Sequence, residues 1–167
     1  EPLTDTIEGR IGIKLGDAIT TDHIMPAGSR LIYRSNIPRY ARFVFEGIDP
    51  SFATRALEGK QRGEYTAVVA GASYGQGSSR EHAAICPMYL GVRIVIAKSF
   101  ERIHAANLIN FGIIPLVFAR ESDYDALMQG SAFKAHRLRE LVRGSERVVI
   151  DVDGKPLECI LSVTARQ

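Results

Sequence analysis

The sequence predicts an α/β domain, because short apolar runs typical of buried strands alternate with segments of helical periodicity. Residues 66–70 and 92–97 are almost wholly apolar, a composition that favours strands buried in a parallel sheet. Between them, residues 80–90 predict a helix that Gly91 ends, and residues 100–111 repeat apolar side chains at the spacing of a helical face. Strands joined by helices form right-handed crossovers, so a mainly parallel central sheet is expected.

Further elements are expected on both sides of this repeat. The patterns predict strands at residues 11–15 and 113–118, short helices at 50–58, 124–129 and 133–142, and a terminal hairpin of 147–152 and 157–163 around Asp153-Gly154. Residues 16–40 carry glycines and prolines without periodicity and predict a long irregular segment, which in a compact domain is usually functional. We interpret residues 1–167 as one domain that forms part of a longer chain or a complex.

The composition is that of a globular protein and argues against several classes of function. Of the 167 residues, 46% are apolar and 24% are charged, and the net charge is only +2. Nucleic-acid binding is therefore not expected as the main function, because it depends on clustered positive charge. No apolar run approaches the roughly 18 residues of a membrane helix. Cys86 and Cys159 form no CxxC pair, so we expect a reduced, cytoplasmic protein without disulfides.

The glycine-rich segment at residues 71–82 carries the strongest signal for chemistry. It lies between a predicted buried strand and a predicted helix, which is where open α/β sheets bind ligands. Gly75 and Gly77 let the backbone approach a ligand, and the free N–H groups at a helix start favour an anion. Arg80 can offer two parallel hydrogen bonds to a carboxylate or phosphate. The spacing therefore indicates an anion site.

A purely structural interpretation fits the same residues equally well. Ser78 and Glu81 have the spacing of a capping box, in which the Ser78 side chain would cap the following helix. The segment lacks the Gly-Lys-Ser/Thr ending of a P-loop, and Arg80 stands where the third glycine of a dinucleotide fingerprint would fall. Helix capping and anion binding both stay open at this point.

Three ordered segments are similar to the C-terminal swivel domain of the aconitase family. They read GDAITTDHIMPAG at 16–28, YGQGSSREHAA at 74–84 and AKSFERIH at 97–104. Together with matches that continue to about residue 118, they cover most of the chain. The resemblance implies a swivelling β/β/α layered domain, which agrees with the α/β pattern above.

The resemblance also implies roles for individual residues. Ser78 matches the family's catalytic base, which removes a proton from the carbon beside a substrate carboxylate. Ser79 and Arg80 match positions that bind a substrate carboxylate, and Arg34 falls where the family places another substrate-binding arginine. A serine is a poor base at its ordinary pKa, so its alkoxide needs the backbone donors and the cation that this turn can offer.

Asp22 and His23 match a supporting part of the family's site. Asp22 is expected to orient an arginine or a serine, as carboxylates behind a binding site do; a simple loop turn is the alternative. His82 and His104 are interpreted as structural histidines, and Cys86 as a packed, buried cysteine rather than half of a metal pair with His82.

The implied cofactor is a [4Fe–4S] cluster in the complete enzyme, with no cluster ligand in this chain. A cluster needs several cysteine thiolates, and Cys86 and Cys159 are too few. The implied partners are cluster-bearing domains or a large subunit, together with a tricarboxylate substrate. The implied reaction is the dehydration and rehydration that interconvert citrate and isocitrate, with iron acting on the leaving hydroxyl. This chain alone is expected to be inactive.

Other members of the family are alternatives, namely homoaconitase and the small subunit of 3-isopropylmalate isomerase. The isomerase typically has glutamine where this chain has His23 and cysteine where it has Gln76, and Arg34 suits a third carboxylate better than an isopropyl group. These features favour aconitase, and Met25-Pro26 resembles the shorter bacterial aconitases. An RNA-binding or anion-binding module is the alternative from another class of protein.

Overall fold

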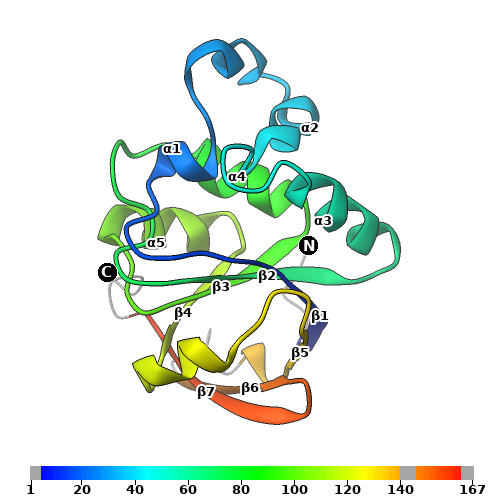
Figure 1. The fold of residues 1–167 in the computed structure, drawn as a ribbon, viewed down its shortest axis with the longest axis vertical. Helices are drawn as coiled ribbons and strands as arrows, with labels where there is room; N and C mark the ends of the chain where they lie inside the picture. Colours follow the sequence, from blue (N-terminus) through cyan, green and yellow to red (C-terminus); the bar gives the residue numbers. More distant parts are fainter. Residues whose placement is uncertain (1–4, 140–145, 163–167) are drawn as a thin grey trace.

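Figure 1 shows a computed structural model of the chain, which describes residues 5–139 and 146–162. The described part contains strands, α-helices and short 3-10 helices (η). In chain order they are β1 (Ile7–Lys14), α1 (Thr21–Ile24), η1 (Gly28–Tyr33), α2 (Ile37–Tyr40), η2 (Ala41–Phe43), α3 (Phe52–Gln61), β2 (Tyr65–Ala70), α4 (His82–Tyr89), β3 (Val92–Ala97), α5 (Arg102–Asn110), β4 (Ile114–Phe118), η3 (Glu121–Ala126), β5 (Ala132–Ala135), β6 (Arg147–Val152) and β7 (Lys155–Leu161).

The described strands close into one sheet with a parallel and an antiparallel half. Their order is β1-β2-β3-β4-β7-β6-β5, with β5 returning to β1. β1 to β4 pair in parallel, whereas the pairs β4–β7, β7–β6, β6–β5 and β5–β1 are antiparallel. The apolar runs therefore predicted the parallel half correctly. The expectation of a mainly parallel central sheet is corrected, because the antiparallel pairs complete a closed sheet.

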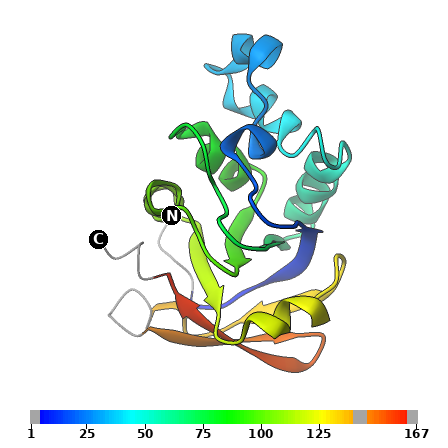
Figure 2. The same cartoon turned by 60° about the vertical axis from the view of Figure 1, so that its left-hand side comes forward.

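Closure of the sheet produces three layers, which both Figure 1 and Figure 2 show. The helices cover the outer face of the parallel half, and β5, β6 and β7 lie on its other side. Adjacent residues of one strand face opposite layers: Val68 packs in the cluster beneath the helices, whereas Val69 packs in the interior of the closed sheet. The β/β/α layering implied by the resemblance is thus present.

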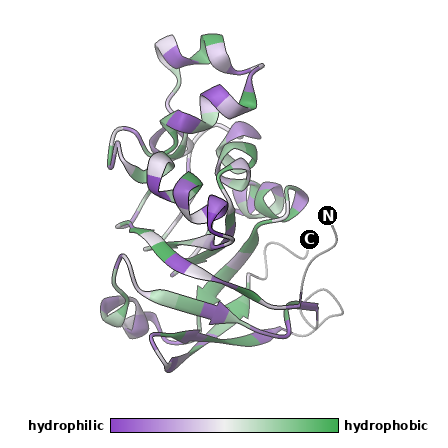
Figure 3. Cartoon of the chain, turned by 90° about the vertical axis from the view of Figure 1, so that its right-hand side faces the viewer, coloured by the Kyte–Doolittle hydropathy of each residue, from purple (hydrophilic) through white to green (hydrophobic). Residues whose placement is uncertain are grey.

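The terminal hairpin follows its predicted pattern closely. Buried and exposed residues alternate along β6, as expected for a strand with one solvated face. Asp153 and Gly154 both have positive φ angles, 51° and 83°, which a two-residue hairpin turn requires. Figure 3 shows hydrophobic and hydrophilic residues interleaved along the strands of this half.

Two predicted helices in the C-terminal third are wrong or shorter than expected. Residues 133–135, predicted as the start of a helix, lie in the strand β5. Leu138 and Arg139 are helical as predicted, and residues 140–142 of that prediction lie outside the described part. The segment 124–129 has only the end of the 3-10 helix η3. The reason is tertiary: Phe133 and Ala135 are buried in the interior cluster at strand spacing, and pairing with β1 and β6 outweighs local helix propensity.

The irregular segment predicted at 16–40 contains short helices instead of extended loop. η1 and α2 lie in the part of the chain that projects above the helical layer in Figure 1. This projection is held by Arg30, which makes an ion pair of 2.8 Å with Glu46 and stacks on the Phe43 ring. None of the helices in the described part is long and apolar enough to span a bilayer.

Substituting Gly9 with alanine should destabilise the fold by about 3 kcal/mol, a cost typical of severe overpacking. A methyl group at Gly9 would overlap the backbone carbonyl of Tyr65, so β1 and β2 would have to separate. Gly47→Ala is the matched control, because a methyl group there meets no neighbour. Urea unfolding of both variants measures the difference, and equal stability of the two would contradict this description of the β1–β2 contact.

Candidate active site

The segment between β2 and α4, residues 71–81, is a sharply folded turn. Gly75 and Gly77 have φ angles of 94° and 99°, which disfavour any residue with a side chain. The backbone of Tyr74 pairs with Phe100, which fixes the middle of the turn to the end of β3. Asp17 fixes its start, because its carboxylate accepts a 2.7 Å hydrogen bond from the Ala72 N–H.

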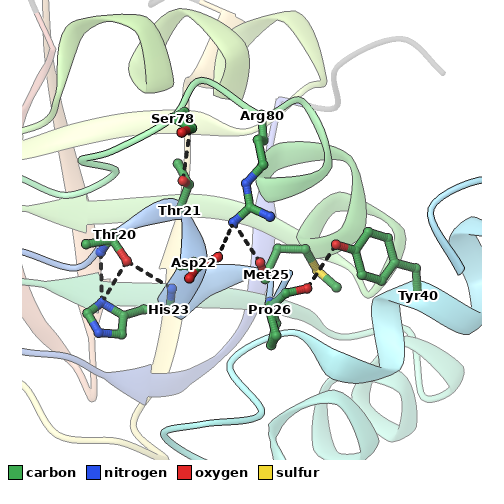
Figure 4. A network of polar contacts seen from close by, with 9 residues as sticks. All are labelled: Thr20, Thr21, Asp22, His23, Met25, Pro26, Tyr40, Ser78 and Arg80. Atoms are coloured by element: carbon green, nitrogen blue, oxygen red, sulfur yellow. Dashed lines mark hydrogen bonds and ion pairs between the residues drawn. The ribbon is translucent and has the colours of Figure 1, made fainter. Parts of the chain in front are cut away.

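This turn is tied directly to the segment that precedes α1. Gly75 donates its N–H to the Ile19 carbonyl at 2.7 Å, and Thr21 donates its N–H to the Gln76 carbonyl at 2.8 Å. The Thr21 hydroxyl also donates to the Ser78 carbonyl at 2.9 Å (Figure 4). Two motifs that are distant in sequence, 16–28 and 74–84, therefore form one structural unit.

Beyond Gln76, the turn presents unpaired backbone donors. The N–H groups of residues 77–80, four in succession, donate to no residue in the described part of the chain. They lead into the N-terminus of α4, where the helix dipole adds partial positive charge. Consecutive free donors at a helix start form a site for an anion, either a carboxylate or a developing oxyanion.

The capping interpretation of Ser78 is not supported. α4 begins at His82 with Glu81 as its N-cap residue, and no side-chain bond caps it. The side chains of Ser78 and Ser79 are exposed, and neither makes a hydrogen bond with the described residues. The Ser78 side chain is therefore accessible to a ligand.

Hydrogen bonds to Asp22 and Met25, in the segment next to the turn, fix the Arg80 side chain. Its Nη2 atom donates to the Asp22 carboxylate at 3.1 Å and to the Met25 carbonyl at 2.8 Å (Figure 4). Its Nη1 atom is buried and has no partner among the described residues. Asp22 thus orients an arginine, which is one of the two roles expected for it. The ion pair is partly exposed, so its main effect is on geometry rather than on stability.

His23 caps α1 and makes no hydrogen bond to the turn among the described residues. Its Nδ1 atom accepts from the Thr20 N–H at 2.9 Å, and the His23 N–H donates to the Thr20 hydroxyl at 3.1 Å. This reciprocal pair is a capping box. His23 therefore fixes the start of the short helix that carries Asp22, and its supporting role in the site stays a prediction.

The backbone carbonyl of Arg34 contacts the first residue of α4. His82, the first residue of α4, donates its Nε2–H to the Arg34 carbonyl at 2.9 Å. The Arg34 side chain is exposed, and its guanidinium has no partner in the described part. The structure thus ties the projecting segment to the helix that follows the serine turn, and leaves the Arg34 side chain available to a ligand.

Sequence analysis missed several residues that shape this site. Asp17 and Thr21 bond to the turn, and the buried His104 ring packs beneath Gly75, where an added methyl group would overlap it. Asp17 and Thr21 lie inside a recognised motif but gave no signal of their own. Only the long-range contacts reveal what they do.

The described residues offer no place for a metal cluster. They contain no group of three or more His, Cys, Asp or Glu side chains that could hold a metal ion. Cys86 and Cys159 are buried in different hydrophobic clusters, and burial raises the pKa of each thiol to about 12. Both are packed thiols, so the described residues do not fit an iron–sulfur cluster.

Fold and site together define a class: a layered, closed-sheet α/β domain in which a serine turn at the end of a parallel strand presents an anion site. Comparison with known families identifies the class, because the model of the aconitase C-terminal domain matches residues 25–121. The chain belongs to the aconitase C-terminal domain family, the swivel domain of hydro-lyases.

Known relatives agree with this assignment. The chain is 35% identical over 164 residues to "Probable aconitate hydratase, mitochondrial" of Dictyostelium discoideum, covering 87% of this chain and 21% of the relative. It is 33% identical to "Homocitrate dehydratase, mitochondrial" of Saccharomyces cerevisiae, covering 78% and 19%. The chain thus spans about a fifth of the length of these curated relatives.

One solved structure resembles almost the whole chain. The crystal structure of 3-isopropylmalate dehydratase (leuD) from Methanocaldococcus jannaschii superposes with a TM-score of 0.72 and 31% sequence identity. The match covers 93% of this chain and 82% of that protein. The layered closed sheet is therefore a fold that occurs in this family also as a separate chain of similar size.

Stability should fall when the pH is lowered from about 6.5 to about 4, because of His104. Burial lowers the pKa of His104 to about 4, whereas the unfolded residue takes up a proton near pH 6.5. The stabilisation is therefore complete above pH 6.5 and is lost as the pH falls, by up to about 3 kcal/mol.

Urea unfolding across this pH range checks the effect in the wild type and in His104→Leu. The variant should lose most of this pH dependence, whereas the exposed His136→Gln control should keep it. An unchanged slope in His104→Leu would contradict the assignment of the effect to His104.

Proposed function

We propose that this chain supplies the proton-transfer and carboxylate-binding part of an aconitate hydratase. Ser78 is the base, and the free N–H groups of residues 77–80 bind a carboxylate of the substrate. The observation that carries the proposal is that row of unpaired donors beside an exposed serine. The family assignment supports a hydro-lyase rather than a phosphate-binding module.

The proton step follows from the chemistry of the turn. Ser78 Oγ removes a proton from the carbon next to a bound carboxylate; the C–H electrons form the new double bond, and the hydroxyl on the neighbouring carbon leaves. A serine oxygen becomes basic enough only where its negative charge is stabilised. Backbone donors, the helix start and the nearby Arg80 provide that stabilisation.

The two arginines divide the remaining carboxylates between them. Arg80, oriented by Asp22, lies behind the turn and adds positive charge at its base. Arg34, in the projecting segment, has an exposed guanidinium with no protein partner among the described residues. A substrate with three carboxylates, such as citrate or isocitrate, can use the turn and both arginines, with Ser79 adding a hydroxyl donor.

The other half of the reaction belongs to other parts of the protein. Because neither cysteine can serve as a ligand, a [4Fe–4S] cluster would be held by cluster-bearing domains or by a large subunit. We propose that this chain is active only beside them. The cytoplasmic location inferred from composition stays a prediction, since curated relatives carry mitochondrial names.

A 3-isopropylmalate dehydratase is the second candidate. The similarity to the solved protein of that name, over 82% of its length, favours it. Arg34 decides between the two substrates, because 3-isopropylmalate has an isopropyl group where citrate has a third carboxylate.

Ser78→Ala in the complete enzyme should lower kcat for citrate about 10²–10⁴-fold with little change in KM, the loss expected when a general base is removed. Ser29→Ala is the matched control and should behave like the wild type, because Ser29 is exposed and its side chain bonds to no described residue. Steady-state kinetics measure both. A Ser78→Ala enzyme that keeps a third or more of the wild-type kcat would exclude Ser78 as the base.

Arg34→Gln should raise KM for citrate about 10- to 100-fold, the value of a hydrogen bond between charged groups. Turnover of 3-isopropylmalate should change little, because no third carboxylate is lost. Arg42→Gln is the control, since Arg42 is also exposed and its guanidinium has no partner among the described residues. If wild-type enzyme turns over 3-isopropylmalate faster than citrate, the second candidate replaces the first.

A further inference from the structure

A buried histidine forms the floor of the serine turn. His104 lies on α5 and is only 2% exposed. Its ring packs at 5.4 Å from the ring of Tyr74 and lies so close to Gly75 that any side chain there would overlap it. Gly75 is three residues before Ser78, so the ring lies beneath the backbone that leads to the serine.

The histidine is costly for the stability of the fold. Neither Nδ1 nor Nε2 has a hydrogen-bond partner among the described residues, although both atoms are buried. Buried polar atoms in folded proteins are nearly always paired, and an unpaired one destabilises the native state. A leucine would occupy similar space without this penalty. Features that violate the rules of packing in this way are concentrated at functional sites.

The turn above the ring has a fixed half and a free half. The Tyr74 carbonyl accepts a hydrogen bond from the Glu101 N–H, and the Gly75 N–H donates one to the Ile19 carbonyl. This half of the turn is therefore fixed on both sides. The Gly75 carbonyl, in contrast, accepts no bond from the described residues, and the N–H groups of residues 77–80 donate none. His104 therefore lies beneath the point where the hydrogen-bonded half of the turn meets the half whose backbone groups have no partner among the described residues.

We propose that His104 is a positioning residue for Ser78, whose neutral ring supports Gly75 and whose nitrogens bond to the turn backbone when a carboxylate occupies the free donors. A neutral imidazole suits this task because it has one donor and one acceptor. The proposal rests on the proposed function of the turn and adds a residue to it. His104 does not touch the substrate and transfers no proton.

The test compares His104→Leu with His104→Gln in the complete enzyme. The two side chains are similar in size, but only glutamine keeps a neutral donor and acceptor. His104→Leu should unfold at the same or a higher temperature than the wild type, yet its kcat should fall about 10- to 100-fold, as for a catalytic group displaced by about 1 Å. KM should change less than about threefold, and His104→Gln should recover part of the lost kcat.

Two further measurements separate positioning from other roles. The pH profile of kcat should keep its shape in both variants, because the ring is not an acid or base in the reaction. Leu108→Val, at another buried position of α5, should lower the unfolding temperature without a specific loss of kcat.

Each outcome has a distinct meaning. Wild-type kcat in His104→Leu, a lower unfolding temperature for it, or equal losses of kcat in the leucine and glutamine variants would overturn the positioning role. If only the His104 results fail while Ser78→Ala remains inactive, the proposed function stands. A wild-type enzyme without hydro-lyase activity would overturn the proposed function itself.

Discussion

The crossing of two backbone segments is the constraint on which this site depends. Hydrogen bonds between Gly75 and Ile19 and between Thr21 and Gln76 hold the serine turn against the start of α1. These bonds use the Gly75 N–H and the Gln76 carbonyl, whereas the N–H groups of residues 77–80 donate to no described residue. The same crossing places Asp22 beside Arg80 and so orients the only arginine of the turn.

The parallel half of the fold could be predicted from local sequence, whereas closure of the sheet could not. Runs such as 92–97 are apolar because strands of a parallel sheet are covered on both faces, and Asp153-Gly154 defines its hairpin through backbone geometry alone. β5 is only a short alternation of buried and exposed residues that is compatible with a helix. Its strand conformation depends on pairing with β1, more than a hundred residues earlier in the chain.

The candidate site, like the fold, could be predicted only in part from the sequence. Ser78, Arg80 and Asp22 lie in motifs, and the structure brings these motifs together. Spacing alone could not decide between a capping box and an anion site, because the outcome depends on where α4 begins. Asp17, Thr21 and His104 act through contacts between distant segments, so no local sequence pattern predicts their contributions.

The chain contains groups that suit one half of the proposed reaction. It offers backbone donors, a serine and arginines, which are groups suited to carboxylates and to a proton, and its thiols are buried. In the proposed function, the cluster lies in another part of the protein, which would have to meet this turn around the substrate. The layered closed sheet is a stable base for the turn, since both hydrophobic clusters consist of described residues of this chain.

The most direct test of the central claim is a structure of the complete enzyme with a bound tricarboxylate. The account predicts a carboxylate within hydrogen-bond distance of the N–H groups of residues 77–80, with Ser78 Oγ facing the carbon that loses its proton. A tricarboxylate bound by other residues, with these N–H groups facing only solvent, would contradict it.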